Sequence, residues 1–176
     1  GPDFTYIARR VSGDIARAVE KAVEATGMHG VRMDRVSGRV YPERALAAHL
    51  VGFVGTENRG LAGAEAAFDQ LLAADPNKAV GSYAYGDAVY LTIDADLQFR
   101  LESLGRQALK ENSAEALALV AVEARTGAVL AYVSLPDFDP NTFLSADRST
   151  WVDRVSMYAY EPGSVFKVYS MASLMA

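Results

Sequence analysis

A serine and a lysine stand three residues apart near the C-terminal end of the sequence, in Glu161–Lys167 (EPGSVFK). Side chains at i and i+3 of a helix lie on the same face and can reach each other. A serine hydroxyl is a nucleophile when a base takes its proton, and burial favours the neutral form of lysine that could act as this base. Pro162-Gly163 fits a helix start, which places Ser164 where free N–H groups favour developing negative charge. Ser164 and Lys167 are the candidate catalytic residues.

The same pair has a simpler interpretation. Ser-x-x-Lys specifies only two positions, and a chain of this length contains about one such pattern by chance. From this pattern alone, an acyl-transfer nucleophile and a chance serine on a core helix both remain open.

Other residues that could do chemistry have better structural explanations. The two histidines follow no metal-ligand spacing, and the glycines of residues 52–63 lack the Gly-Lys-Ser/Thr of a phosphate loop. We therefore expect no metal and no cofactor. Paired carboxylates can hydrolyse glycosides, but helix capping explains Asp94/Asp96 and turn chemistry explains Asp137/Asp139.

The composition excludes several classes of protein. With 17 basic and 22 acidic residues the net charge is −5, which argues against a nucleic-acid binder. The absence of cysteine excludes a disulfide scaffold, a thiolate metal site and a cysteine nucleophile. No apolar run approaches the roughly 18 residues of a membrane span. The opening Gly1-Pro2 is typical of a scar left by tag cleavage, so we expect an upstream segment.

Helical periodicity and turn residues predict the elements of the first half. They are a helix over Thr5–Thr26 that ends at Gly27, strands joined by a turn within Val31–Val40, a short helix over Arg44–Val51, and a helix after the glycine-rich stretch to about Leu72. The stretch Ala74–Asp87 is rich in turn residues and is the best domain boundary in the chain.

A strand over Val89–Ile93 and a helix capped by Asp94 are expected to open the second half. The predicted buried stripe of this helix is Leu97, Leu101, Leu104 and Ala108. Two apolar strands, Leu117–Glu123 and Ala128–Val133, flank the turn Arg125–Gly127 and predict a hairpin. A long loop, Ser134–Gly163, follows, and such loops usually have a function or a partner.

The last twelve residues (VFKVYSMASLMA) predict a helix that is apolar nearly all round, with Lys167 as its only charge. Such a helix is normally buried on every side. The predicted strands could cover one face at best, so we expect further protein beyond Ala176.

Five segments, in this order and spacing, resemble the class B penicillin-binding proteins, the peptidoglycan transpeptidases of the bacterial cell wall. They are Arg39–Phe53, Gly60–Leu72, Leu91–Gln98, Val120–Asn141 and Glu161–Lys167. The first two are more similar to division-type (septal) members than to elongation-type members. One such segment alone would be weak evidence. Five segments in order across nearly the whole chain favour the catalytic interpretation of the Ser-x-x-Lys pair.

The resemblance implies an α+β fold in two parts. Residues 1–87, with 1–2 as the tag scar, correspond to a pedestal or dimerisation-type domain. Residues 88–176 correspond to the N-terminal part of a penicillin-binding transpeptidase domain, truncated just after Ser-x-x-Lys. In that fold the Ser-x-x-Lys helix runs through the core, which would account for its apolar composition.

By the same resemblance, Ser164 is the nucleophile that attacks the D-Ala-D-Ala carbonyl of a stem peptide, and Lys167 is its general base. An amine of a second strand resolves the acyl-enzyme and makes the cross-link, and penicillin acylates the same serine. The family also uses Ser-x-Asn and Lys-Thr-Gly motifs downstream of the nucleophile, and this sequence has neither. We therefore expect the chain alone to be inactive.

The implied partners are the stem peptide, β-lactams, a membrane glycosyltransferase and division proteins, but no nucleic acid. The implied location is the periplasmic or outer side of the inner membrane, with an anchor upstream of Gly1. The competing hypothesis is a non-catalytic pedestal, an interaction module for partners in cell-wall synthesis.

Overall fold

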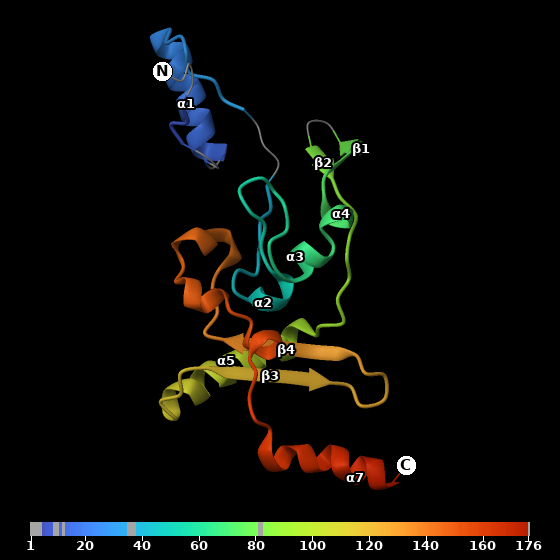
Figure 1. The fold of residues 1–176 in the computed structure, drawn as a ribbon. Coiled ribbons are helices and arrows are strands. Elements are labelled where there is room, and N and C mark those ends of the chain that lie inside the picture. Colours follow the sequence, from blue (N-terminus) through green and yellow to red (C-terminus); the bar gives the residue numbers. More distant parts are fainter. Residues whose placement is uncertain (1–4, 9–10, 12, 35–37, 81–82, 176) are drawn as a thin grey trace.

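The computed structural model describes residues 5–8, 11, 13–34, 38–80 and 83–175, and mixes helices and strands, as the sequence predicts (Figure 1). The α-helices are α1 Gly13–Thr26, α2 Ala48–Val51, α3 Gly63–Ala67, α4 Asp69–Leu72, α5 Ala95–Glu111, α6 Arg154–Met157 and α7 Lys167–Met175. The 3-10 helices are η1 Pro140–Ser145, η2 Arg148–Trp151 and η3 Gly163–Phe166. The strands are β1 Asp75–Val80, β2 Tyr83–Tyr85, β3 Leu117–Val122 and β4 Val129–Leu135.

The predicted hairpin of the second half is confirmed. Strands β3 and β4 pair antiparallel, with Leu117 opposite Leu135 and Val120 opposite Tyr132. Gly127 adopts a positive φ of 77° in the connecting turn, a conformation that glycine reaches without the Cβ clash of other residues. Helix α5 packs on one face of the hairpin and approaches it closely at Gly105, where a Cβ would stand 3.0 Å from Leu135 Cδ1 and the leucine would have to shift.

Helix α5 starts as predicted, but it buries a different face. Asp94 Oδ1 accepts a hydrogen bond of 2.9 Å from the Leu97 N–H and caps the helix. The predicted apolar stripe is wrong in part, because Leu104 is 60% exposed while Gln98 is completely buried. The apolar spacing alone could not show that polar side chains of this helix have partners in the adjacent strand.

Gln98 joins α5 to the outer edge of β4. Its Oε1 accepts from the Tyr132 N–H at 2.7 Å, and its Nε2 donates to the Tyr132 carbonyl at 2.8 Å. The Gln98 amide thus occupies both backbone groups that a further strand would use at this residue. The same Nε2 also donates to Glu102 Oε1 at 2.8 Å.

Glu102 extends this polar connection toward the first half of the chain. Its carboxylate is buried and accepts from the Ala47 N–H at 2.8 Å and from Arg106 at 3.1 Å. Ala47 lies directly before α2 with a left-handed φ of 50°. Buried carboxylates need such partners, because an unpaired charge in the interior is costly. Glu102 therefore holds the start of α2 against α5.

An aromatic core links the segment around α2 to the loop after β4. Phe53 stacks on Phe143 with ring centroids 4.5 Å apart and also contacts Phe138 and Trp151, each at 5.5 Å. His49 is buried beside them, and its Nε2 lies 2.7 Å from the Thr150 carbonyl oxygen. Burying large aromatic rings stabilises a core strongly, so residues far apart in sequence are held together here.

A partly buried ion pair supports the glycine-rich stretch from the other side. Arg39 Nε donates to both Glu65 oxygens, at 2.9 and 3.2 Å, and the same guanidinium donates to the Leu72 carbonyl at 2.8 Å. The Tyr41 hydroxyl accepts from the Val54 N–H at 3.1 Å. Burial, and next the negative charge of Glu65, raise the pKa of Tyr41 to about 12.

Two helix predictions in the first half have to be corrected. The helix expected over Arg44–Val51 begins only at Ala48, because Arg44 and Ala47 have left-handed φ values of 53° and 50° that break a helix. The helix expected to run to Leu72 is two short helices, because Phe68 has φ −114° and ψ 23° between them.

Four other stretches also differ from expectation. The first helix starts at Gly13, since residues 5–8 and 11 are not helical, but it ends at Thr26 as predicted. Described residues of Val31–Val40 form no strand; the predicted turn falls partly on residues 35–37, outside the described ranges. Val89–Ile93 runs beside β4 without ladder pairing, held by Thr92 Oγ1 donating to the Val129 carbonyl at 2.6 Å. The stretch Ala74–Asp87, expected as a turn-rich boundary, contains the β1–β2 hairpin.

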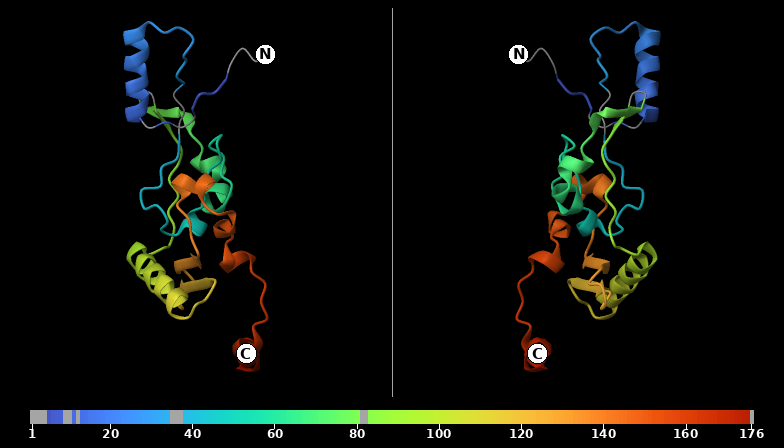
Figure 2. Two further views of the ribbon diagram at one scale, coloured as in Figure 1. Left: turned by 90° about the vertical axis from the view of Figure 1, so that its left-hand side faces the viewer. Right: turned by 90° about the vertical axis from the view of Figure 1, so that its right-hand side faces the viewer.

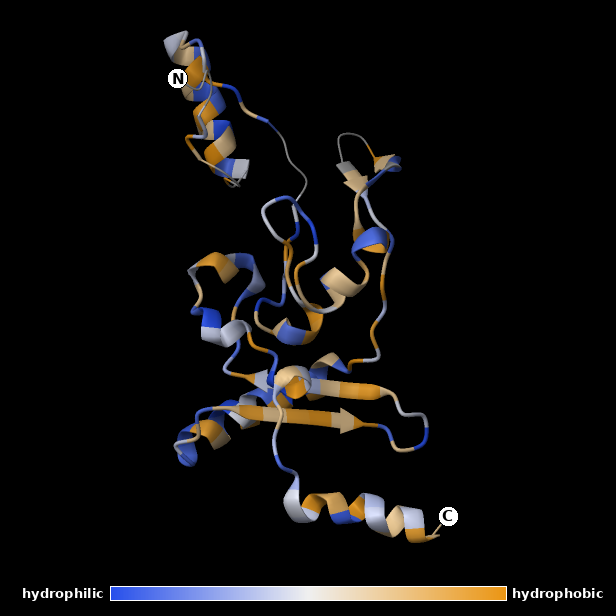
Figure 3. Ribbon diagram, in the orientation of Figure 1, coloured by the Kyte–Doolittle hydropathy of each residue, from blue (hydrophilic) through white to orange (hydrophobic). Residues whose placement is uncertain are grey.

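Helices α1 and α7 stand apart from this body (Figures 1 and 2). Helix α1 has no buried residue, and Ile15 and Val19 of its apolar stripe are exposed. Every residue of α7 is exposed as well. Figure 3 shows hydrophobic residues along α7 and along both strands of the β3–β4 hairpin. The burial expected for α7 from its composition is therefore not found.

Candidate active site

The structure places Ser164 and Lys167 on either side of a junction between two kinds of helix. Ser164 is in η3, and Lys167 is the first residue of α7. Gly163 starts η3 with a positive φ of 55°, and the Val165 N–H donates to the Pro162 carbonyl at 3.2 Å. The Lys167 N–H donates to the carbonyls of Ser164 and Val165. A helical start at Pro162-Gly163 is thus confirmed, although its first turn is 3-10 rather than α.

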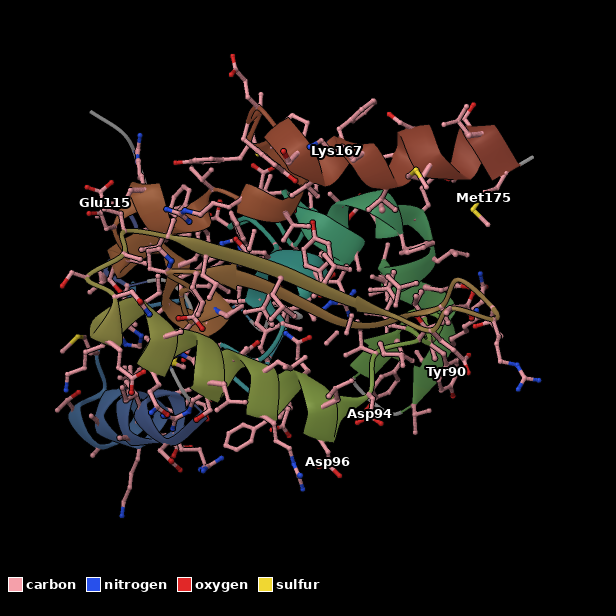
Figure 4. The ribbon with its side chains drawn as sticks, turned by 90° about the horizontal axis from the view of Figure 1, so that it is seen from below. Tyr90, Asp94, Asp96, Glu115, Lys167 and Met175 are labelled. Carbon is pink, nitrogen blue, oxygen red and sulfur yellow. The ribbon has the colours of Figure 1, made fainter. Side chains whose placement is uncertain are left out.

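Both candidate side chains are exposed to solvent. Figure 4 shows Lys167 at the start of α7 and Met175 at its end, with α5 on the opposite side of the hairpin. Within the described ranges, neither the Ser164 hydroxyl nor the Lys167 ammonium has a side-chain hydrogen bond. The burial expected to favour a neutral lysine is not found, because Lys167 is exposed.

The segment leading to Ser164 is fastened to strand β4 by Asp153, a residue to which the sequence analysis assigned no role. Asp153 caps α6, with its Oδ1 accepting from the Val155 N–H at 3.1 Å. Its Oδ2 accepts from the Tyr132 hydroxyl of β4 at 2.6 Å and from the Ser156 hydroxyl at 2.5 Å. An Asp directly before a helical turn is a recognisable cap signal, but the contact with Tyr132 has no signature in the sequence.

Arg154 makes a second attachment at the same place. Its backbone N–H donates to Ser134 Oγ of β4 at 3.0 Å. Its guanidinium donates to the Val152 carbonyl at 3.1 Å and the Ser149 carbonyl at 3.2 Å, and lies 5.9 Å from the centre of the Tyr158 ring. The loop between β4 and α6 is thus closed on itself and fixed to the strand.

The pKa values of Asp153 and Tyr132 reflect the hydrogen bond between these two side chains. Burial alone would raise the pKa of Asp153, but hydrogen bonds from Ser156, Tyr132 and the Val155 N–H outweigh it, and the pKa is lowered. Burial, and next the hydrogen bond to Asp153, raise the pKa of Tyr132 to about 12. At neutral pH the pair is therefore a carboxylate accepting from a neutral phenol.

A cavity of about 370 Å³ lies beside the aromatic core; its lining includes His49 of α2, Trp151 of η2 and Asp153, the cap of α6. Neither Ser164 nor Lys167 lines it. In the part of the chain that the structure describes, no three acidic or histidine side chains come together in a way that could hold a metal ion. The candidate site therefore consists of groups supplied by the segment around Ser164 itself.

Comparison with known proteins assigns this segment to a family. Residues 117–176, which contain the hairpin and both candidate residues, match the family described as "Penicillin binding protein transpeptidase domain". The chain is 34% identical, over 92% of its length, to a Caulobacter vibrioides protein named "Probable peptidoglycan D,D-transpeptidase FtsI". It is 30% identical, over 93% of its length, to "Peptidoglycan D,D-transpeptidase FtsI" of Escherichia coli.

A solved structure supports the same relationship. The crystal structure of penicillin-binding protein 3 from Mycobacterium tuberculosis superposes with a TM-score of 0.68 and 30% sequence identity, covering 77% of this chain and 31% of that one. The chain spans 26% and 30% of the length of the two FtsI relatives. The matched transpeptidase domain and these relatives support a class B penicillin-binding protein of the division type.

Proposed function

We propose that this chain is part of a peptidoglycan D,D-transpeptidase in which Ser164 is the acylated nucleophile and Lys167 its general base. The observation that carries the proposal is the position of this pair. A serine in the first turn after a positive-φ glycine is followed three residues later by the only charge of an apolar helix, within the residues that match the transpeptidase family.

In the proposed reaction the Ser164 hydroxyl gives its proton to the neutral Lys167 amine while Oγ bonds to the D-Ala-D-Ala carbonyl carbon. The amide C–N bond then breaks, and the proton leaves with the terminal D-Ala. An amine of a second stem peptide then attacks the ester carbonyl carbon, the C–O bond to Ser164 breaks, and the proton that the amine loses returns to Ser164 Oγ. A penicillin would acylate the same oxygen as its lactam C–N bond opens.

The chain alone is proposed to be inactive, for two reasons. Lys167 is exposed, so it lacks the buried setting that favours a lysine as a general base. The sequence also has no Ser-x-Asn or Lys-Thr-Gly after Ser164. An oxyanion hole normally needs two donors, and loss of one such donor typically costs about 3–4 kcal/mol of transition-state stabilisation.

For residues 1–87 we propose the role of a pedestal that contacts partners in cell-wall synthesis, and for residues 88–176 that of the first part of the transpeptidase domain. The exposed apolar stripe of α1, with Ile15 and Val19, favours contact with another protein. A membrane glycosyltransferase and division proteins are the proposed partners, and the proposed location is the outer face of the inner membrane. Among the described residues, no helix has the length and hydropathy of a membrane span.

The experiment is labelling with a fluorescent penicillin. The 176-residue chain and a chain extended downstream to the length of the relatives are incubated with the probe and separated on a denaturing gel. We expect label on the extended chain only, lost in Ser164→Ala and kept in Ser170→Ala, a matched serine on α7. Ser164-dependent labelling of the 176-residue chain would overturn its proposed inactivity. A folded extended chain without label would count against the enzyme itself.

A further inference from the structure

The segment that carries Ser164 has one fixed end. Before it, Asp153 and Arg154 hold α6 to strand β4 through Tyr132 and Ser134. After α6, no hydrogen bond within the described ranges joins residues 158–175 to the earlier part of the chain, and all of these residues are exposed. The position of the nucleophile relative to the sheet is therefore set from the α6 end.

The connection between this end and the nucleophile is short. Six residues, 158–163, separate α6 from Ser164, and an extended chain of that length spans at most ~20 Å. Pro162 restricts the connection further, because its ring fixes φ. Where α6 sits on β4 thus limits where Ser164 can lie.

We propose that Asp153 is a positioning residue for Ser164: by tying the start of α6 to Tyr132 of β4, it fixes the base of the segment that bears the nucleophile. Asp153 is suited to this role because one oxygen caps the helix while the other accepts from the strand. A carboxylate with two such oxygens joins the two elements through a single side chain. The inference rests on the proposed function of Ser164.

A neighbouring residue provides a matched control. Asp147 caps η2 in the same way, with its Oδ1 accepting from the Ser149 N–H at 2.9 Å. Its side chain is exposed, and within the described residues it makes no hydrogen bond to a strand. Asp147→Ala therefore removes an aspartate cap without disturbing the contact with β4.

The test measures the first-order acylation constant of Ser164 at saturating penicillin in the extended chain. A misplaced nucleophile reacts more slowly, so Asp153→Ala should lower this constant about 10- to 100-fold, while Asp147→Ala should not. A purely structural defect would lower the labelled amplitude through unfolding and leave the constant of the folded molecules unchanged. Asp153→Asn should restore the rate, because its amide oxygen can cap α6 while the Tyr132 hydroxyl accepts from the amide nitrogen.

Equal effects of the two alanine variants, or no restoration by asparagine, would overturn the proposal. If the wild-type extended chain is not acylated at all, the proposed function fails. Hydrogen exchange in the 176-residue chain then tests separately whether Asp153 ties α6 to β4. The amides of Val155 and Met157 should exchange faster in Asp153→Ala than in Asp147→Ala. Equal exchange in the two variants would show that Asp153 does not hold α6 to β4.

Discussion

Replacing Gln98 with alanine should destabilise the fold far more than a polar residue on an amphipathic helix normally would. The side chain is completely buried and makes three hydrogen bonds, two to the Tyr132 backbone and one to Glu102. Each neutral bond contributes about 1 kcal/mol net, and a bond to a charged group about 1.5–3 kcal/mol. We therefore expect Gln98→Ala to lower the free energy of unfolding by about 3 to 5 kcal/mol, a large part of the ~5–15 kcal/mol typical of a domain.

The assay is urea unfolding followed by the fluorescence of Trp151, the single tryptophan, which packs against Phe53 and Phe143 in the aromatic core. Gln107→Ala is the matched control, since this exposed glutamine of the same helix bonds only to Glu111 within the described residues. Surface changes of this kind usually stay within about 0.5 kcal/mol.

Gln98→Glu separates hydrogen bonding from packing. It keeps the size of the side chain but replaces the donor amide with a charge next to Glu102, so it should destabilise at least as much as alanine. If Gln98→Ala were no more harmful than Gln107→Ala, or if Gln98→Glu were neutral, the role assigned to the Gln98 amide would be wrong.

Two further predictions concern aromatic residues that are partly or fully buried. Tyr41 and Tyr132 should ionise near pH 12, above the usual pKa of about 10; their contribution to stability is present below about pH 10 and is lost as the pH rises toward 12. Absorbance titration at high pH should show tyrosine ionisation near pH 12 in the wild type, and less of it in Tyr132→Phe. If the wild type showed no ionisation near pH 12, the prediction would be wrong. Phe53→Ala should lower the free energy of unfolding by about 3–5 kcal/mol, because Phe53 is buried among three aromatic rings. The partly exposed Phe68 is the control, and equal losses in the two alanine variants would refute the importance of the aromatic core.

Local signals in the sequence predicted those elements whose causes are local. The Asp94 cap and the β3–β4 hairpin follow from a capping side chain and from a turn with glycine between two apolar runs. The short helix before Gly52 was predicted, but its start at Ala48 could not be, because left-handed φ values at Arg44 and Ala47 depend on partners elsewhere, such as Glu102 for the Ala47 N–H.

The buried face of α5 shows why pattern alone was insufficient. Leucine spacing predicted Leu104 inside, whereas Gln98 and Glu102 are buried because β4 and the start of α2 supply their partners. Around the candidate site, the pair Ser164 and Lys167 was found from the motif. Asp153 was not, because its contact with Tyr132 joins residues 21 positions apart.

Mass spectrometry of the penicillin adduct shows directly whether Ser164 is the nucleophile. The extended chain is reacted with penicillin, digested, and the peptide carrying the added mass is fragmented. We predict a single penicilloyl group on Ser164, absent from Ser164→Ala and unchanged in Ser170→Ala. An adduct on any other residue of a folded chain, or no adduct at all, would contradict the assignment of Ser164 as the nucleophile.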